Sequence, residues 1–175
     1  LYQPQHALGN GIWKSTDGGV TWNNIYKLRG ATVVSGSIEV PGTYFMTDII
    51  VRDKDGNSAT TNDSEVFAAI GGTFYSSNPI VTNVGKTNYG IFKSTDDGLS
   101  WAKIALDVNG NSVAPNDFEL DANNTLWMST TRNVFDDGGG QIYSSTDGIS
   151  FSLKHTIPNG RRTEIAVSKL NANTL

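Results

Sequence analysis

Residues 90–101 read GIFKSTDDGLSW, a stretch that recurs as GIWKSTDGGVTW at 11–22 and, one residue shorter, as QIYSSTDGISF at 141–151. In each copy an apolar and aromatic strand end leads into a turn rich in Ser, Asp and Gly. Glycine supplies the positive φ that such turns need, and an aspartate carboxylate can accept N–H groups inside the turn. The stretch therefore predicts a β-hairpin that occurs three times, with the final aromatic ring buried against a neighbouring sheet.

A second repeated element lies between the hairpins. It reads DIIV at 48–51, DFEL at 117–120 and EIAV at 164–167, and in the first two copies a polar turn and another apolar strand follow. One unit is then strand, turn, strand, loop, strand, Asp-turn and strand, which is a four-stranded antiparallel meander. Because meanders arranged radially form β-propellers, the sequence predicts an all-β fold, a partial β-propeller built of four-stranded antiparallel blades.

The repeats divide the chain into five predicted parts. These are the end of one blade (1–28), an extended connection (29–45) with a short strand near Ile38, two blades (46–107 and 108–158) and the first strand of a further blade (159–175). The end units lack strands and would expose sheet edges, which invite association. We therefore expect the remainder of a longer chain, or a partner protein, to cover both ends.

Composition excludes several classes of function. The 175 residues carry a net charge of −4, so there is no basic surface that would favour nucleic acid. No apolar run approaches the ~20 residues that span a bilayer, so we expect no membrane insertion. Cysteine is absent, which excludes disulfides and thiolate metal sites in this segment. We expect no cofactor and no bound metal.

The three hairpins resemble the Asp-box, or BNR repeat, Ser-x-Asp-x-Gly-x-Thr-Trp. The matching positions are Ser15, Asp17, Gly19, Thr21 and Trp22, then Ser94, Asp96, Gly98, Ser100 and Trp101, and in the shortened copy Ser145, Asp147, Gly148 and Phe151. The chain is thus similar to Asp-box β-propellers, among them sialidases, xyloglucan hydrolases, sortilin-type receptors, photosystem assembly propellers and bacterial surface proteins. The resemblance implies that the boxes are structural turns at the blade edges, away from the ligand face.

The catalytic motifs of these families are not found here. No arginine has the sequence context of the sialidase triad, and the Asp pair of xyloglucan hydrolases has no match, so no catalytic residue is assigned. We therefore favour a non-catalytic binding or scaffolding segment of a secreted or cell-surface protein, with a carbohydrate or protein ligand. The alternative is part of an Asp-box glycoside hydrolase, sialidase-like or xyloglucanase-like, whose catalytic residues lie partly outside this segment.

Three acidic residues are candidates for a ligand site. Asp48, Asp117 and Glu164 each begin a first strand, and first strands line the channel of a propeller. They either form an arc that binds a cation, sugar hydroxyls or a basic peptide at the axis, or reflect ordinary polarity at strand ends.

Two further sets of residues were weighed as sites. Asp53, Asp55 and Asn57 have the spacing of a calcium loop, but the distal Glu is missing and a plain Asp-Gly turn is the simpler interpretation. His6 and His155 lie in different units, and nothing in the sequence pairs them.

Overall fold

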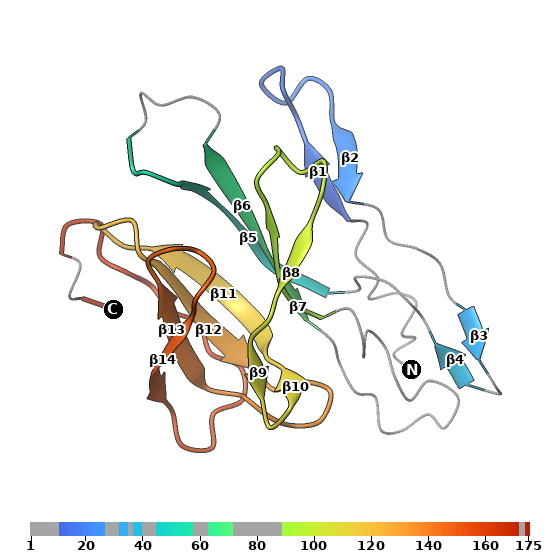
Figure 1. The fold of residues 1–175 in the computed structure, drawn as a ribbon, viewed down its shortest axis with the longest axis vertical. Helices are drawn as coiled ribbons and strands as arrows, with labels where there is room; N and C mark the ends of the chain where they lie inside the picture. Colours follow the sequence, from blue (N-terminus) through green and yellow to red (C-terminus); the bar gives the residue numbers. More distant parts are fainter. Residues whose placement is uncertain are drawn as a thin grey trace.

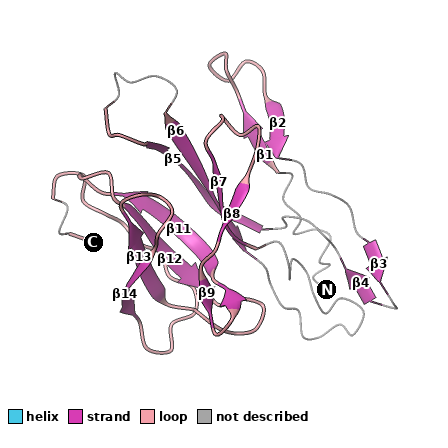
Figure 2. Ribbon diagram, in the orientation of Figure 1, coloured by secondary structure: helices cyan, strands magenta, loops and turns pink. Residues whose placement is uncertain are grey.

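The structure is a computed structural model that describes residues 11–26, 32–34, 37–39, 45–57, 63–71, 89–171 and 174–175. Among these residues there are strands and loops but no helix (Figure 2). A search of the same residues for a helix long and apolar enough to cross a membrane finds none.

The described residues form fourteen strands in five antiparallel sheets (Figure 1). The strands of the two large sheets are β5 (Phe45–Asp53), β6 (Ser64–Gly71), β7 (Gly90–Ser94) and β8 (Ala102–Ile104), then β11 (Ala114–Leu120), β12 (Leu126–Thr131), β13 (Gln141–Ser145) and β14 (Ser152–Thr156). The two-stranded pairs are β1 (Ile12–Lys14) with β2 (Asn23–Tyr26), β3 (Thr32–Val34) with β4 (Ser37–Glu39), and β9 (Asp107–Val108) with β10 (Asn111–Ser112).

The two large sheets are four-stranded meanders in which neighbours in sequence are neighbours in space. They pack as successive blades, with β11 lying against β5 and β6 (Figure 1). The predicted all-β fold, a part of a β-propeller with four-stranded antiparallel blades, is confirmed. The three repeated stretches join β1 to β2, β7 to β8 and β13 to β14, which are the third and fourth strands of their units.

Two segments differ from the simplest expectation. The predicted short strand near Ile38 is half of the β3–β4 hairpin, so the connection between the first two units has a small sheet of its own. Residues 163–168, predicted as the first strand of a further blade, have no strand assignment. A strand is defined by its ladder of hydrogen bonds, and no partner from the same sheet lies beside this segment among the described residues.

The sheet β5–β8 is apolar on both faces because successive side chains of a strand point to opposite sides. On β6, Phe67 and Ala69 join a core with β11 and β12, including Phe118 and Met128. Ala68 and Ile70 face the other way and pack with Ile12, and with Tyr26 and Trp101, against the β1–β2 hairpin. Full burial of a side chain such as Phe67 contributes roughly 1.5–3 kcal/mol. Each face of β6 is therefore covered by a neighbouring unit, whereas Ile49 and Val51 of β5 remain exposed.

A buried group of charges lies at the junction between the two large sheets. Glu65, only 2% exposed, pairs with Lys93 at 2.6 Å and lies 3.7 Å from Nη1 of Arg52. The Arg52 guanidinium also donates to the carbonyl of Thr146 in the next blade. Because buried charges persist only when they are paired and hydrogen-bonded, this cluster fixes where the β13–β14 turn can dock.

Gly148 fits this junction because it has no side chain. A Cβ at Gly148 would lie 2.7 Å from Cζ of Phe67 and 2.8 Å from Nη1 of Arg52, and its φ is +66°. Gly18 has the same kind of backbone, with φ +68°, but a Cβ there would meet nothing within 4 Å. The two glycines therefore share the conformational requirement and differ only in the space around them.

We predict that Gly148→Ala lowers the free energy of unfolding by about 1–3 kcal/mol more than Gly18→Ala, which is the usual cost of overpacking. Both variants place alanine at positive φ, so the strain of that conformation cancels in the comparison. Chemical denaturation of the two variants and the wild type measures the difference. Equal losses would show that the Gly148 turn does not pack against the preceding blade as described.

Candidate functional site

The three repeated turns share one hydrogen-bonding scheme. In the first, the Ser15 hydroxyl donates to Asp17 at 2.8 Å and accepts from the Gly19 N–H at 2.8 Å. The Asp17 carboxylate also accepts from the N–H and the hydroxyl of Thr21, at 2.8 and 2.6 Å. The indole N–H of Trp22 completes the turn by donating to the Gly19 carbonyl at 3.0 Å.

The second turn repeats these contacts almost atom for atom. Ser94 bridges Asp96 and the Gly98 N–H, both at 2.8 Å, and Asp96 accepts from the N–H of Ser100 at 2.8 Å and from its hydroxyl at 2.5 Å. Trp101 Nε1 donates to the Gly98 carbonyl at 3.1 Å. The Ser and Asp side chains therefore satisfy turn N–H groups from within the turn.

The shortened third turn keeps the scheme with one residue fewer. Asp147 accepts from the N–H groups of Ile149 and Ser150 at 2.8 and 2.7 Å, and Ser145 accepts from the Gly148 N–H at 2.9 Å. The hydrogen bonds of the Ser and Asp side chains described here all stay within their own turn. The resemblance implied such a role for these residues, and nothing in their geometry points to a reacting atom.

The aromatic residues that end the turns do not behave alike. The Trp101 ring packs edge-on against Tyr26 of the β1–β2 hairpin, with 5.5 Å between centroids. Trp22, by contrast, is 58% exposed, so its expected burial against a neighbouring sheet is not found. The physical reason is positional, because among the described residues no sheet lies on the far side of the β1–β2 hairpin.

Hydrogen bonds shift the acidity of the turn carboxylates. The hydroxyl and N–H of Thr21, together with the Ser15 hydroxyl, lower the pKa of Asp17 from 3.8 to about 2. Ser100 and Ser94 do the same for Asp96, whose pKa also falls to about 2. The N–H groups of Ser150 and Ile149 lower the pKa of Asp147 further. All three carboxylates are ionised acceptors at any ordinary pH.

The three acidic candidates are engaged with protein groups. They do not begin strands as predicted, because β5 and β11 each start three residues earlier and the segment of Glu164 has no strand assignment. Asp48 Oδ2 accepts from the N–H of Phe118 at 2.7 Å, and Asp117 Oδ2 accepts from the N–H of Ile165 at 2.8 Å. Glu164 forms an exposed ion pair with Arg162 at 2.5 Å. Desolvation raises the pKa of Asp117, while the N–H of Ile165 partly offsets that rise. A ligand role for these acids at the axis stays a prediction. Asp48 and Asp117 also have a structural role, because each accepts a backbone N–H from the following unit.

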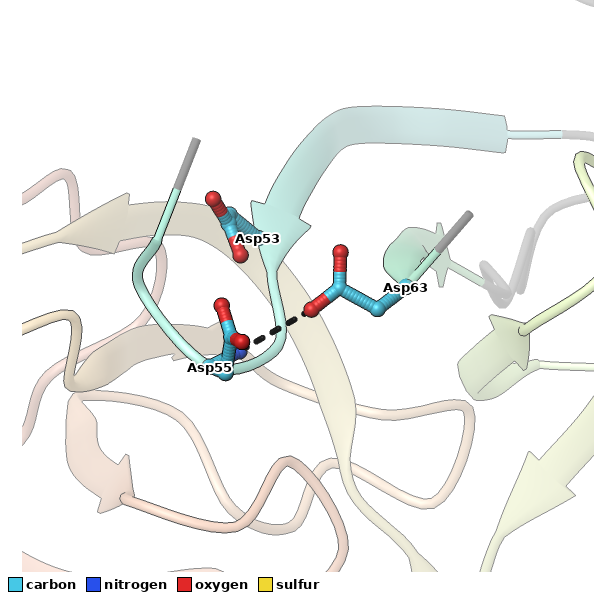
Figure 3. A group of neighbouring side chains, drawn as sticks. All are labelled: Asp53, Asp55 and Asp63. Atoms are coloured by element: carbon cyan, nitrogen blue, oxygen red, sulfur yellow. Dashed lines mark hydrogen bonds between the residues drawn. The ribbon is translucent and has the colours of Figure 1, made fainter. Parts of the chain in front are cut away.

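A separate acidic cluster lies at the turn after β5 (Figure 3). The carboxylates of Asp53, Asp55 and Asp63 come within 4.8 Å of one another, and Asp55 N–H donates to Asp63 at 3.4 Å. Partial desolvation, the hydrogen bond with Asp55 and the charges of Asp63 and Asp55 raise the pKa of Asp53. The N–H of Asn57, the third residue of the calcium-loop spacing, donates to Asp55 Oδ1 at 2.7 Å.

Sequence reasoning missed Asp63, because it follows a loop whose path no local pattern fixes. The two histidines are not brought together among the described residues. His6 lies outside the described residues, and His155 is on the exposed strand β14. Arg132 forms an ion pair with Asp136 at 2.7 Å on a surface loop.

Comparison with known proteins identifies sequences that are similar to this chain. No family model matches the chain. The chain is 29% identical over 146 residues to the xyloglucanase Xgh74A of Acetivibrio thermocellus, a match that covers 77% of this chain and 15% of that protein. It is 25% identical over 126 residues to a xyloglucanase of a Paenibacillus species, covering 72% of this chain and 11% of that protein.

One solved structure is also similar in part. The crystal structure of a GH74 enzyme from Niastella koreensis aligns with a TM-score of 0.49 and 22% identity, over 82% of this chain and 18% of that one. The chain thus spans about 15% or less of the length of the curated relatives it matches. Of the families that the Asp-box resemblance implied, the comparisons point to the xyloglucan hydrolases.

We predict that Ser94→Ala lowers the free energy of unfolding by about 1–3 kcal/mol, because it leaves the buried Gly98 N–H without its acceptor. Ser94 is 1% exposed, so water does not reach the gap. The matched variant Ser15→Ala breaks the same bonds in the exposed first turn, where water replaces the hydroxyl, and is expected to cost less. Thermal and chemical denaturation compare the two, and a larger loss for Ser15→Ala would contradict this view of the turns.

The lowered pKa values of Asp17 and Asp96 predict a loss of stability in acid. A carboxylate whose folded pKa lies below its unfolded value stabilises the fold above the unfolded value, here 3.8, and loses that contribution as pH falls toward 2. Melting temperatures between pH 5 and pH 2 should therefore fall mainly below pH 4. The double variant Asp17→Asn and Asp96→Asn should melt lower at pH 5 and show a flatter fall. An unchanged slope in that variant would assign the acid sensitivity to other groups.

Proposed function

We propose that this chain is a segment of a glycoside hydrolase that acts on xyloglucan. The observation that carries the proposal is the 29% identity over 146 residues to a xyloglucanase, which extends over most of this chain. The four-stranded blades of the structure agree with it, since such blades form propellers that hold ligands between them. This favours the hydrolase alternative over a purely non-catalytic module.

Within such an enzyme the segment supplies architecture. The turn carboxylates accept local hydrogen bonds. The charged residues Arg52, Glu65 and Lys93 are buried at a blade junction. Asp48 and Asp117 accept from N–H groups of the following unit. Carboxylates of a glycosidase need a free face toward the scissile bond. We therefore assign the catalytic pair to other blades of the longer polypeptide.

The open side of the sheet β5–β8 supports a longer polypeptide. Ile49 and Val51 on the inner strand β5 are 46% and 60% exposed, whereas the equivalent residue of Ile49 in the next blade, Phe118, is 3% exposed beneath β5 and β6. A groove of about 400 Å³ runs beside them, lined in part by Trp13 and Asp48. We propose that the inner strands of a preceding blade of the same polypeptide cover this face.

Xyloglucan is a polymer that an enzyme meets outside the cell. A secreted or cell-surface location therefore belongs to the same proposal, and no nucleic acid is expected as a partner.

The test is hydrolysis by the complete polypeptide that contains this chain. Incubation with xyloglucan is expected to release new reducing ends, whereas unsubstituted mannan and a sialylated oligosaccharide serve as controls. Release of sialic acid would favour a sialidase-like enzyme instead. Retention on xyloglucan without any release would overturn the hydrolase proposal in favour of a binding module.

A further inference from the structure

A tripeptide of one design lies near the start of β5 and of β11, and it recurs at 163–165, a segment without a strand assignment. It reads Thr47-Asp48-Ile49, Asn116-Asp117-Phe118 and Thr163-Glu164-Ile165. Each has a hydrogen-bonding side chain, then an acid, then an apolar residue. The hydrolase proposal makes no use of the first position.

The first two copies lie on the same irregularity of the backbone. The register of β5 with β6 shifts between Met46 and Asp48, and that of β11 with β12 shifts between Pro115 and Asp117. The residue skipped in each ladder is Thr47 or Asn116. A β-bulge of this kind re-aims side chains at a sheet edge, and here it directs two adjacent side chains toward the next blade.

The two side chains bind the backbone of the next inner strand. Thr47 Oγ1 donates to the carbonyl of Pro115 at 3.0 Å, while Asp48 Oδ2 accepts from the N–H of Phe118 at 2.7 Å. At the following junction, Asn116 Nδ2 donates to the carbonyl of Thr163 at 2.7 Å. Asp117 Oδ2 accepts from the N–H of Ile165 at 2.8 Å. At that junction Ser129 Oγ also donates to the Thr163 carbonyl, at 2.5 Å. Both junctions thus pair a neutral donor and a charged acceptor of the tripeptide with one carbonyl and one N–H of the next segment.

We propose that this pair of side chains is a clasp that joins successive blades, and that Thr163 and Glu164 form the same site for the inner strand of the blade that follows. The ligand of the clasp is an extended backbone that offers a carbonyl and, two or three residues later, an N–H. Because the clasp binds main-chain groups, the bound residues can have different side chains. Pro115 and Thr163, which supply the two carbonyls, differ in this way.

The state of Glu164 fits a clasp that is still open. Within the part of the chain that the structure describes, its carboxylate pairs with Arg162 alone, and both side chains are more than 60% exposed. Exposed ion pairs of this kind are weak and exchange readily. A strand that presents an N–H can therefore displace Arg162, as Phe118 and Ile165 occupy the equivalent carboxylates of Asp48 and Asp117.

Hydrogen exchange of single amides in the complete polypeptide tests the clasp. Asp48→Ala should accelerate exchange of the Phe118 N–H about tenfold or more and leave Ile165 unchanged, because a charge-assisted hydrogen bond is lost at one junction only. Asp117→Ala should do the reverse. Mass spectrometry with fragmentation of peptides spanning 114–120 and 163–168 reads both amides in one experiment.

Matched variants separate the clasp from general loss of stability. Glu119→Ala removes an acid from the same strand as Asp117, and no hydrogen bond from Glu119 to another blade is found among the described residues, so both amides should stay protected. Asp48→Asn and Asp117→Asn keep an acceptor oxygen and should give smaller accelerations if the alanine variants fold poorly. Glu164→Ala should accelerate one amide of the strand that occupies the third clasp.

Two results would overturn the proposal. If Asp48→Ala or Asp117→Ala accelerated exchange of the Phe118 and Ile165 amides equally, these acids would contribute only to global stability and would not join particular blades. Weaker binding of a xyloglucan oligosaccharide by the double Asn variant, with exchange unchanged, would assign Asp48 and Asp117 to an axial ligand site instead. Neither readout depends on hydrolysis, so failure of the clasp and failure of the proposed enzyme activity are distinguishable.

Discussion

The sheet β5–β8 must be covered on both faces, and the rest of the structure depends on this constraint. Alternate side chains of β6 enter two different cores, Phe67 and Ala69 on one side and Ala68 and Ile70 on the other. A single sheet of this composition would expose one apolar layer to water at a cost of about 25 cal/mol for each Å². Neighbouring units on either side are therefore a requirement of the blade.

Apolar packing alone does not fix how two twisted sheets are rotated relative to each other. The polar contacts at the junction do so, because hydrogen bonds are directional. The inner strands are held by Asp48 and Asp117, and nearer the end of β5 Arg52, with Glu65, receives the Gly148 turn. A junction that is fixed at two separate points can repeat with a constant angle, which is the geometric condition for blades arranged around an axis.

The same contacts explain why most charged residues of this segment have no visible ligand role. The Asp-box carboxylates hold their own turns, and two inner-strand acids hold the next blade. The cluster of Asp53, Asp55 and Asp63 is different, since partial desolvation and the neighbouring carboxylates raise the pKa of Asp53. Its equivalent turn in the next blade carries Asp121, which accepts from the indole N–H of Trp127 at 2.9 Å. The equivalent turns of the two blades are therefore built with different interactions: a group of three carboxylates in one, and a single carboxylate bound to an indole N–H in the other.

The sequence by itself determined the turns, the strand order and the blade, because these rest on interactions between residues close along the chain. Ser15, Asp17 and Thr21 lie within one turn, so their hydrogen bonds follow from the local pattern. The tertiary structure alone decided that Asp48 meets Phe118, 70 residues away, that Asp63 joins Asp53, and that Trp22 stays exposed while Trp101 is packed. These outcomes depend on the bulge, on the angle between sheets and on which neighbour is present, and no short stretch of sequence encodes any of the three.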